Sequence, residues 1–444
     1  MKIKISDFLI VLLGFLLAYS VETIRGVNPI NSILRLLRLS SIPFLMFVIV
    51  VLIPQQPLNK IRRLFFLFLP PLGLMLINLL QLFALPAEVL PTHTTGSARF
   101  TAWFLLYFAV LLNLNAATVK KMKKKVFFFL ITLFVVGISL YPLIIMQAGG
   151  SLGSALSNYG QLGDRYQLAG IFGSANEDAN GLVTLLPLAM LWIERQKPTK
   201  RKALRWLLLV YFPLVLVFNG TRTALLISFP LIALLFYWRL SLYKLLCIIG
   251  PVFTLLLGTI AASESVVSRF FAEEMQGGGT FGWRIEHAWI PTIQYTLSQS
   301  PLFGFGTRGW EFICTKLSII NPADGLVVPA HSGYVWSFIT WGASGFCLYI
   351  AFLLILLAES IKLARSKQPE RSRTGRALLC SVIGYCFWAF ISNVMWPQGW
   401  LILLCVAILI ACEKVSILTE EQEDTETQGS DRKKEWVESY AIAP

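Results

Sequence analysis

The chain has 444 residues, of which 56% are hydrophobic and 14% charged, and its formal net charge is +14. So apolar a composition leaves too little polar surface to cover a soluble globule. The basic residues occur as short clusters between apolar runs rather than as one stripe, which argues against a nucleic-acid-binding protein. We therefore predict an all-α, polytopic integral membrane protein with no nucleic-acid partner.

Apolar runs of about twenty residues, each long enough to cross a hydrocarbon core of about 30 Å, recur from the N-terminus to about Cys412. The first follows Met1 to Lys4 and lacks a convincing cleavage site, so we interpret it as a retained helix. Together the runs define one predicted membrane domain over residues 1–412. We predict about twelve spans, centred near residues 14, 47, 75, 108, 136, 186, 211, 229, 253, 345, 385 and 405.

The distribution of Lys and Arg predicts the orientation of these spans. With the N-terminus in the cytoplasm, the cytoplasmic connections carry 24 Lys and Arg and the outer connections carry ten. An excess of this sign marks the cytoplasmic face. An even number of spans also places residues 413–444 in the cytoplasm. This segment has nine acidic and four basic residues and no apolar periodicity, so we predict a disordered tail.

Two outer connections stand out by their length, residues 149–176 and residues 263–330, and function is expected to concentrate in them. The second contains the turn signals Gly277–Gly279 and Ser300–Gly306 on either side of a predicted helix from Trp283 to Leu297. Apolar residues repeat every four positions along this helix. A short helix with one apolar stripe can lie on the membrane or cap a cavity.

Arg222 interrupts the apolar run from Leu207 to Phe236, within a segment that reads as a tight outer hairpin. An arginine there is costly in lipid and needs a partner. At the outer membrane boundary its planar guanidinium can bind phosphate oxygens in a bidentate manner. The alternative interpretation is that Arg222 has no binding role and its side chain snorkels from a loop into water.

His331 begins the helix that follows the long outer connection, and it is one of three histidines in the chain. An imidazole at a helix entrance can take a proton from an attacking hydroxyl. An ordinary polar cap is the alternative for His331, and structural roles are favoured for His93 and His287.

Arg284 and Arg308 lie in the long outer connection, on the side that basic residues usually avoid. Anion binding is a natural use for them, and the alternatives are solvated surface charge or ion pairs with Glu286 or Glu311. The outer carboxylates provide no D-x-D arrangement for a metal that bridges phosphates, so we predict neither a metal nor another cofactor. Those carboxylates are Asp164, Glu177, Asp178, Glu273 and Glu274.

Four passages resemble the O-antigen ligase and polymerase superfamily of bacterial envelope glycosyltransferases. They are Gly170–Asn176; Asn219–Leu226; Arg284–Trp289 followed by Pro301–Gly306; and His331–Ser332 with Gly342 and Gly345. The resemblance covers residues 170 to 345 and places the long connection where the family has one. It favours the ligase type and implies a GT-C-like membrane fold whose long periplasmic loop contains short helices.

In ligases of this family, an arginine followed four residues later by leucine, and a histidine followed by a small polar residue and a distant glycine, mark the active site. Arg222 with Leu226, and His331–Ser332 with Gly342, match those positions. The resemblance implies metal-independent transfer of a glycan from undecaprenyl pyrophosphate to a glycolipid hydroxyl, commonly on lipid A core, at the periplasmic face of the bacterial inner membrane. Arg222 and Arg284, with Arg308 as a third candidate, would hold the pyrophosphate, and His331 would orient or deprotonate the acceptor.

Two alternatives stay open at this stage. A polysaccharide polymerase shares the domain and often has an arginine separated by ten residues from a glycine. None of six outer arginines has a glycine at that spacing; these are Arg99, Arg165, Arg222, Arg269, Arg284 and Arg308. A transporter or flippase would place its ionisable residues near the bilayer midplane, whereas here they gather at the predicted outer ends of helices.

Overall fold

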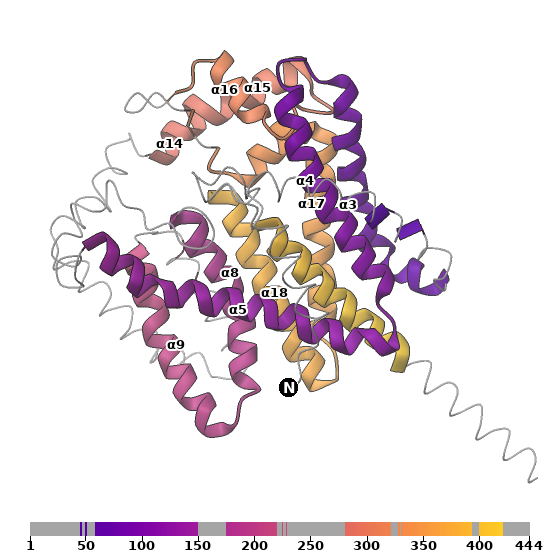
Figure 1. Ribbon diagram of the computed structural model, residues 1–444, viewed down its shortest axis with the longest axis vertical. Coiled ribbons are helices and arrows are strands. Elements are labelled where there is room, and N and C mark those ends of the chain that lie inside the picture. Colours follow the sequence, from indigo (N-terminus) through magenta and orange to yellow (C-terminus); the bar gives the residue numbers. More distant parts are fainter. Residues whose placement is uncertain are drawn as a thin grey trace, which may run out of the picture.

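The computed structural model describes residues 45–46, 49–50, 58–149, 175–219, 224, 228, 280–320, 327–328, 330–392 and 399–420. Within these residues the fold is entirely helical, and the β pairing there is one isolated antiparallel bridge between Ile320 and Val327. Figure 1 shows the helices as a bundle whose upper end is crossed by short helices from the second half of the chain. The all-α prediction is therefore confirmed for the described part of the chain.

The long helices coincide with predicted apolar runs. They are α3 (Leu58–Ala84), α4 (Leu90–Asn113), α5 (Ala116–Gly149), α8 (Ala175–Glu194), α9 (Pro198–Asn219), α17 (Gly333–Ala364), α18 (Pro369–Ile391) and a last helix, Gly399–Glu420. The runs predicted near residues 14, 229 and 253, and most of the run near residue 47, lie outside the described residues. The predicted total of about twelve spans therefore stays a prediction.

Three of the described helices are long and apolar enough to cross a membrane: Lys60–Ala84, Gly333–Ala364 and Gly399–Glu420. Two of them expose large apolar side chains, including Leu76 and Phe83 on α3 and Leu354 on α17. Such side chains are stable on a surface that contacts lipid tails rather than water. The chain is therefore a helical membrane protein.

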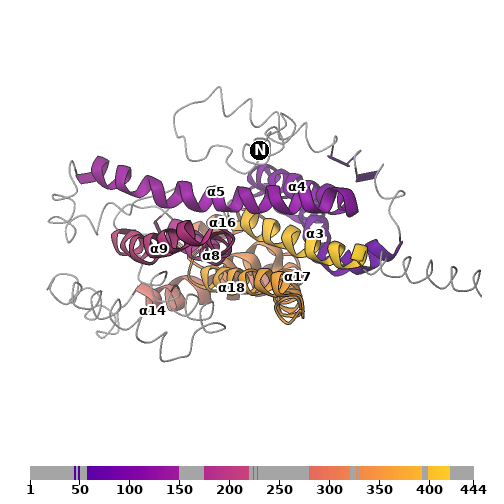
Figure 2. The same ribbon diagram turned by 90° about the horizontal axis from the view of Figure 1, so that it is seen from below.

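Helix α17 lies at the centre of the arrangement, where it packs against α3 and α18, and α18 in turn packs against α8. Viewed along the bundle, α5 lies on one side and α17 and α18 on the other, with the last helix between them (Figure 2). Trp400 at the start of the last helix is fully buried and contacts the rings of Phe100, Trp341 and Phe352. This aromatic cluster joins the last helix to α4 and α17.

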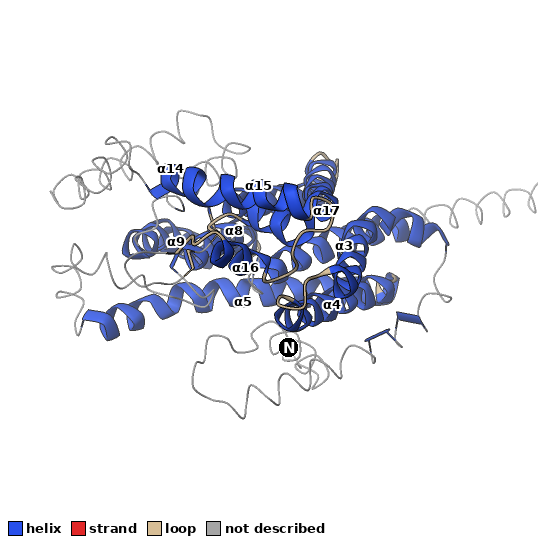
Figure 3. Cartoon of the chain, turned by 90° about the horizontal axis from the view of Figure 1, so that it is seen from above, coloured by secondary structure: helices blue, strands red, loops and turns tan. Residues whose placement is uncertain are grey.

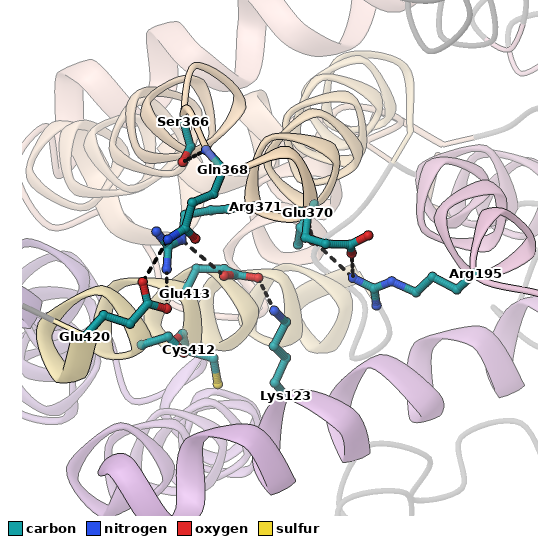
Figure 4. A network of polar contacts seen from close by, with 11 residues as sticks. Lys123, Arg195, Ser366, Gln368, Glu370, Arg371, Cys412, Glu413 and Glu420 are labelled. Atoms are coloured by element: carbon teal, nitrogen blue, oxygen red, sulfur yellow. Dashed lines mark hydrogen bonds and ion pairs between the residues drawn. The ribbon is translucent and has the colours of Figure 1, made fainter. Parts of the chain in front are cut away.

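A network of charges joins several helices (Figure 4). It includes the first turns of α18, which follow the end of α17 that is far from His331. Glu413 of the last helix is buried and forms ion pairs with Lys123 of α5 and Arg371 of α18. Arg371 also binds Glu420 at 2.9 Å, and nearby Arg195, at the end of α8, lies 3.8 Å from Glu370. Three basic clusters that the charge pattern places on one side of the membrane thus meet at one end of the bundle.

The last helix continues to Glu420, eight residues past the predicted limit of the membrane domain at residue 412. The carboxylate of Glu413 explains the extension, because its two basic partners stabilise the additional helical turns against α5 and α18. The folded region therefore ends at or after Glu420. The remainder of the predicted tail, residues 421–444, lies outside the described residues.

Helix α17 is broken in its middle at Gly342, whose φ of 63° and ψ of −166° are not helical. A break inside a membrane helix leaves backbone groups that need new partners. The loop Pro301–Gly306 supplies them: the N–H groups of Phe305 and Gly306 donate to the carbonyls of Ile339 and Thr340 at 2.8 and 2.9 Å. In return, Ala343 N–H donates to Pro301 O at 2.8 Å.

Glycine is required on both sides of this contact. Gly304 and Gly342 both have positive φ, and a Cβ on either one would collide with backbone atoms of the facing segment. Two buried polar side chains of α3 complete the joint. Gln81 donates to the carbonyls of Phe303 and Thr340, and Asn78 accepts from the indole of Trp341 at 3.0 Å. These hydrogen bonds hold the Pro301–Gly306 loop against the break in α17.

Candidate functional site

Short helices of the long connection between residues 263 and 330 lie across one end of the bundle (Figure 3). Helices α14 (Thr280–Arg284), η3 (Ile285–Trp289) and α15 (Ile290–Gln299) form one continuous helical stretch, and α16 (Gly309–Lys316) follows after the Pro301–Gly306 loop. The helix predicted from Trp283 to Leu297 is therefore present and slightly longer. It carries Arg284 at the end of its first segment.

The middle segment of this stretch, η3, is a π-helix. Pro291 accounts for it, because proline has no N–H to donate to the carbonyl of His287 and its ring would collide with that carbonyl in a regular α-helix. The backbone hydrogen bonds of this segment therefore span five residues instead of four, and Ile290 N–H donates to Ile285 O. Single π turns of this kind are found frequently at functional sites.

The π turn changes which residues face the protein. Ala288, Trp289, Thr292 and Thr296 are buried, whereas Leu297 is 53% exposed. The predicted stripe of one apolar residue in every four therefore fails at its last member, because the wider turn rotates the following helix. Trp289, a member of the predicted stripe, is buried, and its indole N–H donates to Ala330 O at 2.7 Å.

His331 lies at the entrance of α17, directly after Ala330. Ser332 is the N-cap of that helix, and its hydroxyl accepts from Val335 N–H at 3.4 Å. His331 has a φ of 49°, which places it in the left-handed region that non-glycine residues seldom adopt. Such a conformation costs roughly 1–2 kcal/mol and needs surroundings that hold it in place.

Arg284 and His331, which are far apart in the sequence, come together at this end of the bundle. Burial, and then the positive charge of Arg284, lower the pKa of His331 from 6.5 to about 4. Burial also lowers the pKa of Arg284, although an arginine stays charged at any physiological pH. The site therefore presents a neutral imidazole beside a half-buried guanidinium.

This arrangement can do two chemical tasks. A neutral imidazole can accept a proton from a hydroxyl, and a guanidinium can stabilise a phosphate oxygen that gains negative charge. No ion pair joins Arg284 to Glu286 in the described part of the chain, so that alternative for Arg284 is not observed there.

Arg308 has a different environment. It lies at the start of α16, about half exposed, and forms an ion pair of 3.0 Å with Glu311. This pair is one of the alternatives that the sequence left open for Arg308. Its predicted contact with pyrophosphate is not tested by the geometry and stays a prediction.

The two other histidines have structural surroundings. His93 is fully buried: its Nδ1 accepts from Thr307 N–H at 3.2 Å, and its Nε2 lies 3.1 Å from Asn78 O. It thus connects α3, α4 and the outer loop. His287 is exposed and stacks on Trp283, with ring centroids 5.5 Å apart.

Arg222 lies outside the described residues, so its predicted place beside Arg284 and His331 stays a prediction. Sequence reasoning missed Trp289 and Gln81, whose side chains fix the loop and the broken helix. Gln81 had a usable signal, because a polar residue within a membrane span usually has a specific partner. Among the described residues, no group of three His, Cys, Asp or Glu side chains could hold a metal ion.

A family model described as O-antigen ligase matches residues 207–350 of the chain. The match begins after the Gly170–Asn176 passage and includes Arg222, Arg284, Arg308 and His331. It confirms the resemblance stated from the sequence over that segment. A comparison with curated protein sequences finds no significant match.

Proposed function

From the premise that residues 207–350 match the O-antigen ligase family, we propose that this membrane protein is a ligase-type glycosyltransferase. It transfers a glycan from undecaprenyl pyrophosphate to a hydroxyl of a glycolipid acceptor, such as lipid A core, without a metal ion. It lies in the bacterial inner membrane, with about twelve spans in a GT-C-like fold and the Arg284 and His331 end facing the periplasm.

The juxtaposition of Arg284 and His331 is the observation that carries this proposal. In the transfer, the acceptor oxygen attacks the anomeric carbon of the glycan while its proton moves to the neutral imidazole of His331. The bond between that carbon and the pyrophosphate oxygen breaks, and the pyrophosphate leaves with the electron pair. Arg284, together with Arg222 and Arg308, stabilises the negative charge that develops on the leaving group.

The low pKa of His331 belongs to the protein without a donor. A lipid–pyrophosphate–glycan is a diester that brings negative charge next to Arg284. This charge opposes the effect of Arg284 and is expected to raise the pKa of His331 towards neutrality, where an imidazole is a better base. Donor binding would thus prepare the base for the reaction that follows.

Purified protein, reconstituted with a polyprenyl-pyrophosphate-linked glycan and lipid A core, distinguishes the three activities. A ligase moves the glycan onto the core and does so in excess EDTA. A polymerase lengthens the glycan on its lipid carrier, and a flippase changes only the side of the membrane on which the donor is found. Lengthening without attachment, flipping without transfer, or a strict need for added magnesium or manganese would contradict the proposal.

The proposed orientation can be tested at Gly282. This residue is exposed, and a Cβ there would meet no other atom within 4 Å, so Gly282→Cys is expected to preserve the fold. In intact cells, an impermeant thiol reagent added outside is expected to label Gly282→Cys above the unmodified protein. The matched control is Lys367→Cys, an exposed position at the other end of α17, which is expected to stay unlabelled. The reverse labelling pattern would overturn the orientation.

A further inference from the structure

We infer that Trp289 and Trp310 act as positioning residues for His331, by holding the backbone of the segment that leads to it. The expected effect on glycan transfer rests on the proposed function. The expected effect on the conformation of His331 rests on the geometry alone. Both tryptophans are buried, and each donates its indole N–H to a carbonyl of residues 328–330.

The segment before His331 is held at successive points. Val327 forms the antiparallel bridge with Ile320, Val328 O accepts from the Trp310 indole at 2.7 Å, and Ala330 O accepts from the Trp289 indole at 2.7 Å. Ser332 then caps α17 through Val335 N–H. Bonds on both sides of His331 therefore determine the path of its backbone.

The energies are sufficient for this role. The left-handed conformation of His331 costs roughly 1–2 kcal/mol. Each indole bond contributes about 1 kcal/mol net, and burial of two indole rings adds to that. The bonds thus offset the unfavourable φ, which would relax towards the ordinary helical or extended range without them.

The two tryptophans come from different parts of the outer connection. Trp289 ends the π-helix that directly follows Arg284, the last residue of α14, whereas Trp310 belongs to α16. A single bond from Trp289 therefore sets the distance between the cationic helix and the base. A general base must lie within about 3 Å of the proton it removes, and a displacement of about 1 Å can cost about a hundredfold in rate.

The test compares Trp289→Phe and Trp310→Phe with Trp283→Phe. Phenylalanine keeps an aromatic ring but has no N–H to donate. Trp283 is the matched control, because it lies on the same helical stretch, is 37% exposed, and can keep its stacking on His287 as phenylalanine.

The first measurement needs no transfer activity. Diethyl pyrocarbonate modifies neutral imidazole, and peptide mass spectrometry can follow His331 with the exposed His287 as internal reference. We expect several-fold faster modification of His331 in Trp289→Phe and Trp310→Phe than in the wild type, and no change in Trp283→Phe. Equal rates in all four proteins would overturn the inference.

The second measurement is the transfer reaction itself. Loss of one positioning bond is expected to lower kcat about tenfold in Trp289→Phe, while KM for the lipid-linked donor stays within about twofold. Faster modification of His331 with unchanged kcat would overturn the role in catalysis. If the wild type transfers no glycan, the proposed function fails, and the modification experiment still tests the positioning.

Discussion

The two ends of the bundle differ in how their charged side chains are paired. At the end shown in Figure 4, Glu413 joins Lys123 and Arg371, so that buried charges neutralise one another. At the other end, the positive charge of Arg284 disfavours protonation of His331 and keeps that imidazole neutral. Among the described residues no carboxylate pairs with Arg284, and a partly buried charge beside an ionisable group with a shifted pKa is typical of functional sites. The comparison separates a structural network from the site that we propose to be reactive.

Polar groups at the two ends also differ in their origin. The network away from His331 is built from side chains of four helices, whereas the His331 end is organised largely by backbone groups and indole N–H donors. A side-chain network can exchange partners when one residue changes. A backbone conformation such as that of His331 depends on particular bonds, so the two ends are expected to respond differently to substitution.

The largest expected effect is that of His331→Ala. Removing a general base typically lowers the rate about 10²- to 10⁴-fold, and we expect kcat for glycan transfer to fall in that range. Binding of the lipid-linked donor is expected to change little, because the pyrophosphate contacts belong to arginines. Transfer assays and donor-binding measurements on the same preparation check this, and wild-type kcat at equal folded protein would exclude His331 from the mechanism.

Arg222 tests whether the site extends beyond the described residues. We expect Arg222→Lys to lose nearly as much transfer activity as Arg222→Ala, about a hundredfold, because an ammonium keeps the charge but not the planar pair of donors. The comparison is made on purified variants with equal protein in the membrane. Wild-type activity of Arg222→Lys would show that a bidentate contact with pyrophosphate is not needed.

Arg284→Ala is expected to act mainly on the donor. A hydrogen bond to a charged group contributes about 1.5–3 kcal/mol, so KM for the lipid-linked donor should rise roughly ten- to a hundredfold. Arg308→Ala is the matched comparison, because Arg308 already pairs with Glu311. An equal rise in KM in both variants would mean that the ion pair with Glu311 does not distinguish Arg308 from Arg284 in donor binding.

The smallest expected effect on activity is that of Glu413→Gln. This change breaks a buried ion pair and is expected to destabilise the fold by on the order of 2 kcal/mol. The effect is below that of a fully buried pair because the Lys123 side chain is 31% exposed. Thermal unfolding of the detergent-solubilised protein should begin at a lower temperature, while kcat/KM of the folded fraction stays unchanged. Loss of kcat/KM without a change in stability would remove the distinction between the two ends.

Much of the fold follows from the sequence because lipid imposes strong rules. Length and hydropathy located α3, α17 and the last helix, and the charge bias grouped Lys123, Arg195 and Arg371 at one end. Arg284 and His331 were found as unusual residues at the opposite side of the predicted membrane. These signals are local or averaged over long segments, so a single sequence contains them.

The remaining features depend on contacts between distant residues. The Pro301–Gly306 loop bonds to the break at Gly342, and Gln81 reaches Thr340 across the bundle. The sequence showed the glycines but not which backbone they allow to approach. Pro291 could have indicated the π turn, yet the exposure of Leu297 that follows from it appears only once the helix is packed.

The central claim is that Arg284 and His331 form one reactive site, and the pH dependence of kcat/KM tests it most directly. This parameter reports the ionisation of the free protein, and the pyrophosphate diester has no group that titrates near neutral pH. In the wild type, kcat/KM is expected to be constant through neutral pH and to fall only as the pH approaches about 4, where His331 becomes protonated. In Arg284→Gln, one of the two causes that lower the pKa of His331 is removed, so the fall is expected to begin at a higher pH. An acidic limb at the same pH in both proteins would contradict the claim.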